Sequence, residues 1–141
     1  MASYISADEL ASIVGDPAKT PGVDYLIVDA RDEDYQIGHI PGAVNVPAHD
    51  IRLRAGKLID KYRAVPLVVF HCALSQQRGP KSARIYSEIV QARLETEQPG
   101  SPLAGQTVQV LRGGFVGWAE RFRRTKPELI EDFDQARWDA M

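Results

Sequence analysis

The sequence predicts an α/β fold in which a mostly parallel central sheet is flanked by helices on both faces. Short apolar runs at residues 25–28, 66–70 and 108–111 alternate with longer segments of helical periodicity. The runs are rich in branched residues, which is typical of strands buried on both faces. In such sheets, ligands bind at the carboxyl ends of the strands.

The size and composition are those of one ordinary globular domain. The chain has 141 residues, of which 44% are hydrophobic and 26% charged, and its net charge is −2, so we expect one domain over residues 1–141. The balanced charge argues against binding to nucleic acid or to a membrane surface. No apolar run approaches the roughly 20 residues that cross a bilayer. The segment Met1–Ala7 lacks the basic and apolar regions of a signal peptide.

The chain contains one cysteine, Cys72. A single thiol forms neither an internal disulfide nor a multi-cysteine metal site, so no metal is expected and a disulfide-stapled secreted scaffold is excluded. These features predict a reducing compartment. The predicted location is the cytoplasm, with the nucleus as an alternative.

The segment Ser6–Glu9 predicts the start of the first helix, because a serine and a glutamate at this spacing form a capping box. Apolar residues at helical spacing follow, and Gly15 ends the helix. Beyond the strand at residues 25–28 comes an acidic turn at residues 32–34, which we expect to face solvent. Pro41-Gly42 marks a further turn.

Three further helices are expected in the rest of the chain. They cover residues 51–62, residues 81 to about 97, and residues 115–122. The acidic tail, residues 126–141, is predicted to be partly helical, as an appended segment. Its aromatic residues either pack on the domain or mediate self-association, and the sequence leaves both open.

A cysteine and an arginine stand six positions apart, between a buried strand and a helix. Cys72 follows the strand at residues 66–70, and Arg78 precedes a helix with Pro80 near its start. Successive main-chain N–H groups between them can curl into a nest, at which the helix directs its positive end. These surroundings predict a thiolate at neutral pH. The planar guanidinium of Arg78 matches two oxygens of a tetrahedral oxyanion.

The predicted oxyanion cradle consists of the main-chain N–H groups of six loop residues: Ala73, Leu74, Ser75, Gln76, Gln77 and Arg78. The Ser75 hydroxyl is also placed to donate to the sulfur and help it leave in a second step. We expect His71 to be a structural hydrogen-bonding partner of the loop. Asp29 is a candidate general acid, but a buried carboxylate paired with Arg31 is the favoured interpretation. A lone cysteine is more often a small buried apolar residue, and its setting here favours the nucleophile.

Four motifs follow one another along the chain. They are VDAR at residues 28–31, GHIPGAVNVP at 38–47, HCALSQQRGP at 71–80, and LRGGF at 111–115 with Trp118. Together they resemble the rhodanese-fold enzymes of the mitotic-inducer dual-specificity phosphatase type, which include the small eukaryotic arsenate reductases. The resemblance implies a rhodanese-like domain, in which the paired glycines form a turn and Trp118 lies in the core.

The resemblance also implies a chemistry. Sulfurtransferases of this fold have a loop one residue shorter, so the longer loop from Cys72 to Arg78 implies a socket for phosphate or arsenate. Cys72 would then be the nucleophile and Arg78 the clamp, in a protein or aryl phosphate phosphatase, an arsenate reductase, or both. The alternatives are a thiosulfate sulfurtransferase working through a Cys72 persulfide, and a catalytically idle binding module.

No bound cofactor is expected. With one cysteine, arsenate reduction needs an external thiol such as glutathione, and glutaredoxin is the expected recycling partner. The extra cysteines that form a zinc site in some plant relatives are absent. The expected ligands are therefore a small oxyanion or a phosphorylated substrate. The loop also lacks the acidic residue of the larger mitotic phosphatases, so it offers no general acid.

Overall fold

A computed structural model describes residues 3–141, and Met1 and Ala2, the first residues of the segment compared with a signal peptide, lie outside the described residues. The strands are β1 (Ser3–Ile5), β2 (Leu26–Asp29), β3 (Val44–Asn45), β4 (Leu67–His71) and β5 (Thr107–Leu111). The α-helices are α1 (Ala7–Val14), α2 (Ile51–Tyr62), α3 (Arg78–Leu94), α4 (Gly114–Phe122) and α5 (Gln135–Asp139). None of the described helices has both the length and the apolar character needed to cross a membrane.

The five described strands form one parallel sheet in the order β1-β5-β4-β2-β3. β4 lies at its centre, between β5 and β2. Asp29, the last residue of β2, pairs with His71, the last residue of β4. The carboxyl ends of these two strands therefore lie side by side. The predicted α/β class is confirmed, and every described strand pair is parallel.

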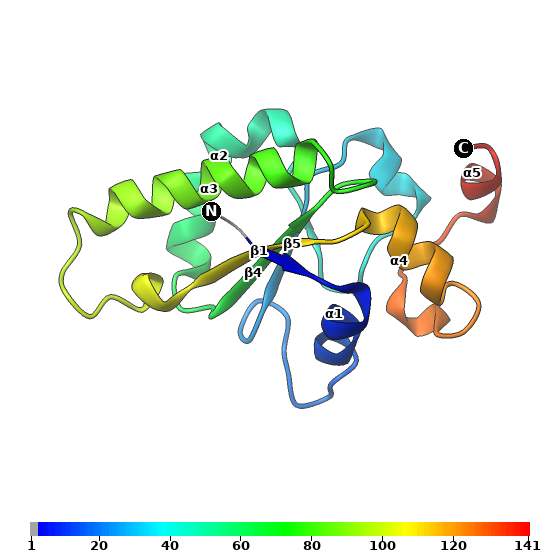
Figure 1. Cartoon of the computed structure of the whole chain (residues 1–141), viewed down its shortest axis with the longest axis horizontal. Coiled ribbons are helices and arrows are strands. Elements are labelled where there is room, and N and C mark those ends of the chain that lie inside the picture. The colour runs from blue at the N-terminus through cyan, green and yellow to red at the C-terminus, as the bar shows by residue number, and fades with distance from the viewer. Residues whose placement is uncertain (1–2) are drawn as a thin grey trace.

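Helices cover both faces of the sheet. Val28 and Phe70 belong to an apolar cluster with residues of α2 and α3, whereas Ile27 and Val69 belong to a second cluster with residues of α1 and α4. Figure 1 shows α2 and α3 on one side of the strands and α1 on the other. This double coverage explains why the central strands are continuous apolar runs.

Two short strands and one helix start differ from the sequence-based expectation. β1 and β3 were not predicted, because strands of three and two residues at the edges of the sheet carry no periodic pattern. α3 begins at Arg78, three residues before the predicted start, and ends at Leu94. Pro80 fits inside its first turn, where a main-chain N–H needs no acceptor.

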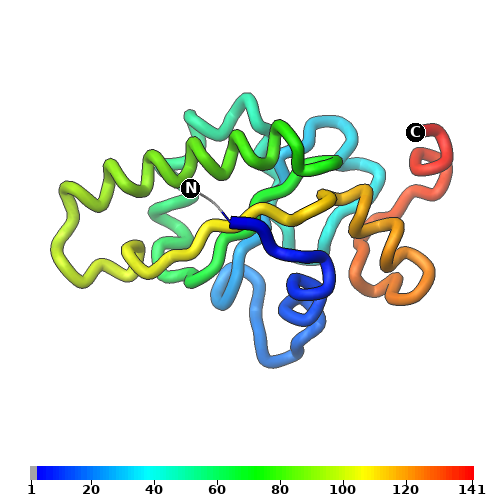
Figure 2. The backbone as a smooth tube through the Cα atoms, in the orientation of Figure 1, coloured from blue at the N-terminus to red at the C-terminus, as the bar shows by residue number. Residues whose placement is uncertain are grey.

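The tail packs on its own domain. The main-chain N–H of Glu131 donates to the carbonyl of His39 at 2.8 Å, and the N–H of His39 donates back at 3.0 Å. Phe133 and Trp138 pack against the cluster beneath α1 and α4. Figure 2 shows the tail, coloured orange to red, leaving α4 and ending away from the sheet. Of the two roles left open for the tail aromatics, the structure shows packing on the domain.

Candidate active site

Cys72 lies at the carboxyl edge of the sheet, directly after β4. The residue is 3% exposed. It borders a cavity of about 280 Å³ together with Arg78 and with the loop residues Ala73, Leu74, Gln76 and Gln77. The structure therefore brings the predicted nucleophile and the predicted clamp to one cavity.

The start of α4 holds the active-site loop from behind. The N–H of Phe115 donates to the carbonyl of Cys72, and the N–H of Val116 donates to the carbonyl of Ala73, both at 2.9 Å. Gly114, at φ +60°, lies so close to the loop that a Cβ would be 2.4 Å from the Ala73 oxygen. The carbonyls of Cys72 and Ala73 consequently point toward α4.

The main-chain N–H groups of the loop are left available. Within the part of the chain that the structure describes, the N–H groups of residues 73–77 donate to no acceptor. The first N–H groups of α3 follow immediately, and a helix provides no internal acceptor for its first turn. Such consecutive donors, together with the positive end of a helix, form an anion-binding nest.

Ser75 has an unusual position within this loop. Its φ is +55°, in the left-handed region that a serine seldom adopts, and the residue is 4% exposed. Its Oγ has no hydrogen-bonding partner among the described residues. A buried hydroxyl without a partner costs about 1–3 kcal/mol. Among the described residues that border the cavity Ser75 is absent, and its buried Oγ makes no hydrogen bond to the Cys72 sulfur.

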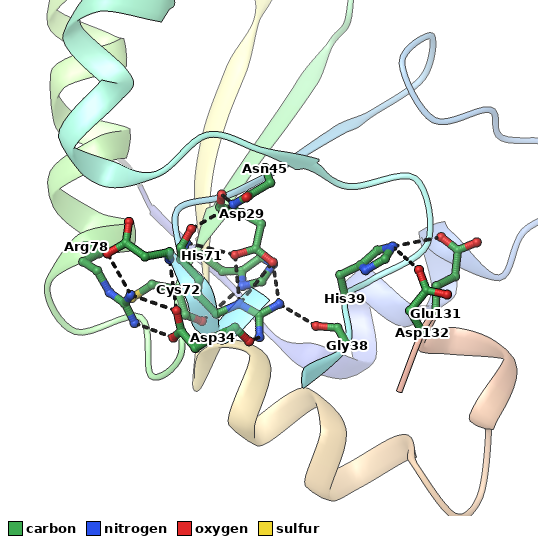
Figure 3. A network of polar contacts seen from close by, with 12 residues as sticks. Asp29, Asp34, Gly38, His39, Asn45, His71, Cys72, Arg78, Glu131 and Asp132 are labelled. Carbon is green, nitrogen blue, oxygen red and sulfur yellow. Dashed lines mark hydrogen bonds and ion pairs between the residues drawn. The ribbon is translucent and has the colours of Figure 1, made fainter. Parts of the chain in front are cut away.

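The Arg78 side chain reaches from the first turn of α3 to Asp34. Its Nη1 donates to Asp34 Oδ1 at 3.2 Å, and its Nη2 donates to Asp34 Oδ2 at 2.9 Å. Figure 3 shows the two side chains pointing toward each other. The hydrogen bonds from Arg78 to Asp34 raise the pKa of the guanidinium, against the opposing effect of burial. Asp32 contributes a weaker ion pair, 3.9 Å from Nη1.

Sequence reasoning missed Asp34. The turn at residues 32–34 was expected to face solvent, but the Asp34 side chain is only 29% exposed and pairs with Arg78. The two residues are 44 positions apart, so no local pattern links them. The pairing could have been predicted only from the fold, because the ends of β2 and β4 lie side by side.

Behind the loop, Asp29 and Arg31 form a buried ion pair. Nη2 of Arg31 donates to Asp29 Oδ2 at 2.7 Å, and Nε donates to Oδ1 at 2.9 Å, with side-chain exposures of 1% and 0%. Burial by itself raises the pKa of Asp29, but the positive charge that His71 carries when it is protonated and the hydrogen bonds from Arg31 outweigh it and hold the pKa below its ordinary value. This geometry agrees with the favoured interpretation of Asp29 as a partner of Arg31.

His71 is completely buried beneath the loop. Its Nδ1 lies 3.1 Å from the carbonyl oxygen of Cys72. Because a carbonyl oxygen can only accept, Nδ1 carries the proton and donates it. Burial lowers the pKa of His71, although Asp29, with Oδ2 3.6 Å from Nε2, opposes this effect. The contact is that of a structural partner of the loop.

Most of the chain matches a known protein family. The model of the Rhodanese-like domain family matches residues 6–121. The chain belongs to the rhodanese-like domain family. This rhodanese-like domain is 33% identical over 128 residues to the dual specificity phosphatase ibp1 of Schizosaccharomyces pombe, and the alignment covers 85% of this chain and 90% of that protein.

A second relative carries a different activity in its name. The rhodanese-like domain is 31% identical over 117 residues to arsenate reductase 2.2 of Oryza sativa subsp. japonica, covering 82% of this chain and 81% of that protein. Among solved structures, it matches the As-Sb reductase from Leishmania major with a TM-score of 0.69 and 28% identity, over 92% of this chain and 85% of that one. These matches confirm the family resemblance drawn from the motifs.

Proposed function

We propose that this rhodanese-like domain is a cysteine-dependent enzyme that acts on tetrahedral oxyanions, as a phosphatase, as an arsenate reductase, or as both. The observation that carries the proposal is the cavity that Cys72 and Arg78 both border, beside the free N–H groups of residues 73–77. A thiol, a guanidinium and a row of main-chain donors are the groups that bind and attack a phosphate or arsenate. Relatives named as a dual specificity phosphatase and as an arsenate reductase support this class.

In the first step, the Cys72 thiolate attacks phosphorus or arsenic in line with the leaving oxygen. A bond from sulfur to phosphorus or arsenic forms, and the bond to the leaving oxygen breaks. The N–H groups of the loop and the guanidinium of Arg78 stabilise the charge on the remaining oxygens. The same N–H groups, together with the positive end of α3, form a site that favours a bound anion.

In the second step, the two reactions part. For a phosphate ester, water attacks phosphorus and releases inorganic phosphate, while the bonding electrons return to the Cys72 sulfur. The Ser75 hydroxyl donates to that departing thiolate. For arsenate, a glutathione thiolate attacks the sulfur, the electrons of the sulfur–arsenic bond remain on arsenic, and As(V) becomes As(III). The resulting disulfide between Cys72 and glutathione is then reduced by a glutaredoxin-type thiol.

The site favours substrates with good leaving groups. Residues 73–77 carry no charged side chain, and Asp29 is fully buried and paired with Arg31. Proton donation to a leaving group is typically worth about 10²–10⁴-fold in rate. We therefore expect aryl phosphates to react faster than alkyl phosphates by a factor in that range.

One panel of assays tests the proposal. Wild type, Cys72→Ser and Arg78→Ala are assayed with an aryl phosphate, with arsenate plus glutathione and glutaredoxin, and with thiosulfate plus cyanide. We expect turnover of at least one oxyanion substrate, its loss in Cys72→Ser, and a drop of about 10²-fold or more in Arg78→Ala. Arg52→Ala, which changes an exposed arginine of α2, is the matched control and should retain full activity.

The same panel decides against the alternative. Membership of the rhodanese-like family also favours sulfur transfer through a Cys72 persulfide. Turnover of thiosulfate with no activity on either oxyanion would contradict the proposal and support the sulfurtransferase. Oxyanion turnover that survives Cys72→Ser would contradict the mechanism for either substrate.

A further inference from the structure

The contact between Arg78 and Asp34 uses only one edge of the guanidinium. A guanidinium carries five N–H donors in a planar fork. Asp34 accepts from the two terminal nitrogens, one bond to each carboxylate oxygen. Nε of Arg78 donates to no acceptor within residues 3–141. The edge formed by Nε–H and one further terminal N–H is therefore left as a second parallel pair of donors, which matches two oxygens of a phosphate or arsenate.

Asp34 is itself held in place. Its Oδ1 accepts from the main-chain N–H of Asp32 at 3.0 Å, and its main-chain carbonyl accepts from Nη1 of Arg31 at 3.1 Å. Arg31 is fixed in turn by its buried ion pair with Asp29 and by the carbonyl of Gly38. A chain of contacts thus runs from the buried end of β2 to the Arg78 guanidinium.

We propose that Asp34 is a positioning residue for the oxyanion clamp: it grips the end of the Arg78 guanidinium and so presents the Nε edge to the oxyanion that Cys72 attacks. The inference rests on the function proposed above. An arginine side chain has many rotamers, and ordering them at the moment of binding opposes binding. A carboxylate that orders Arg78 beforehand removes this cost. It also leaves the loop N–H groups and the guanidinium aimed at one point.

Binding of inorganic phosphate, measured by isothermal titration calorimetry, tests the role without depending on turnover. Asp34→Asn keeps the side-chain size and the oxygen that accepts from Asp32, but removes the charge. We expect it to weaken phosphate binding about 10- to 100-fold, by analogy with the loss of a side chain that orients a metal ligand. Asp34→Glu should recover part of the affinity. Glu33→Gln, which neutralises the adjacent exposed carboxylate, should stay within about twofold of wild type.

A double-mutant cycle shows whether Asp34 acts through Arg78. Asp34→Asn should have no further effect on phosphate binding in an Arg78→Ala background. With an aryl phosphate, Asp34→Asn should raise KM as well as lower kcat, whereas partial unfolding would lower kcat alone. An equal loss of affinity with and without Arg78 would overturn the positioning role.

The outcomes separate this inference from the proposed function. If Arg78→Ala binds phosphate as tightly as wild type, the clamp itself is wrong and the proposed function loses its basis. If Arg78→Ala loses binding while Asp34→Asn does not, only the positioning role is wrong. Tighter phosphate binding by Asp34→Asn would also overturn it, because the carboxylate would then compete with the oxyanion for Arg78.

Discussion

Gly114 lies directly against the carbonyl of Ala73, where a Cβ would stand 2.4 Å from the oxygen, and its φ of +60° is in the left-handed region. Gly114→Ala must therefore displace the start of α4, the active-site loop, or both. We expect a loss of about 2–4 kcal/mol in the free energy of unfolding, from the backbone strain and the overpacking together. Urea denaturation measures this loss, and phosphate binding should weaken in parallel.

Gly117→Ala is the matched control in the same helix. A Cβ at Gly117 meets nothing within 4 Å, so the alanine should leave stability unchanged or raise it by up to about 1 kcal/mol. Equal destabilisation by both substitutions would show that α4 tolerates no alanine, and would remove the argument for a specific contact at Gly114.

Ser75→Ala should alter the second chemical step and leave the fold intact. The buried Ser75 hydroxyl makes no hydrogen bond among the described residues, so its removal should leave the free energy of unfolding unchanged or raise it by up to about 1–3 kcal/mol. Without a donor to the departing sulfur, the cysteinyl-phosphate should break down about 10-fold or more slowly. Rapid-quench kinetics with an aryl phosphate should then show a burst and an accumulated intermediate.

Ser82→Ala provides the comparison for Ser75. Ser82 is also buried, its Oγ also lacks a partner among residues 3–141, and it lies within α3, outside the loop. Its alanine variant should show wild-type kinetics. A burst in both variants, or in neither, would contradict the role assigned to Ser75.

Asp29→Asn should be strongly destabilising, because it leaves the buried Arg31 guanidinium without its counter-charge. Breaking a buried ion pair at one partner typically costs about 3–5 kcal/mol. Asp8→Asn is the control, since the Asp8–Arg121 pair has side-chain exposures of 64% and 55% and should contribute less than about 1 kcal/mol. Thermal and urea unfolding of both variants measure the difference. A cost for Asp29→Asn as small as that for Asp8→Asn would show that the buried pair is dispensable.

The free energy of unfolding should fall as the pH is lowered below about 6.5. Burial holds the pKa of His71 below its ordinary value of 6.5, so in this range the unfolded chain takes up a proton that the folded chain does not. The loss can reach at most about 1.4 kcal/mol per pH unit for one group. Asp29, whose pKa is also lowered, adds a further loss as the pH falls below its ordinary value of 3.8.

His71→Asn isolates the first of these effects. The amide can still donate to the Cys72 carbonyl, but it does not titrate. Urea unfolding between pH 7 and pH 5 should therefore show a flatter stability profile for His71→Asn than for wild type. His49→Asn, at a histidine with a 70% exposed side chain, should keep the wild-type profile. A wild-type slope in His71→Asn would assign the acid sensitivity to another group.

The central strands and the cysteine loop could be predicted from the sequence because their signals are local. β2 and β4 are unbroken apolar runs, and Cys72 and Arg78 stand six positions apart around a strand end. The edge strand β3 escaped prediction, because two residues paired only with β2 carry no pattern of their own. The contact between Asp34 and Arg78 was not predicted for a related reason, because the two residues meet only after two distant strand ends have been brought together.

The hydrogen bonds from Phe115 and Val116 to the cysteine loop also determine when the active-site loop can form during synthesis of the chain. The ribosome synthesises Cys72 well before α4. Strand β1 likewise pairs only after β5 has been made, because its residue Ser3 lies 106 positions before its partner Gln109. A nascent chain that ends before α4 thus contains the thiol but lacks the two N–H donors that hold the carbonyls of Cys72 and Ala73. The socket is completed only when α4 has folded against the loop in the middle of the chain.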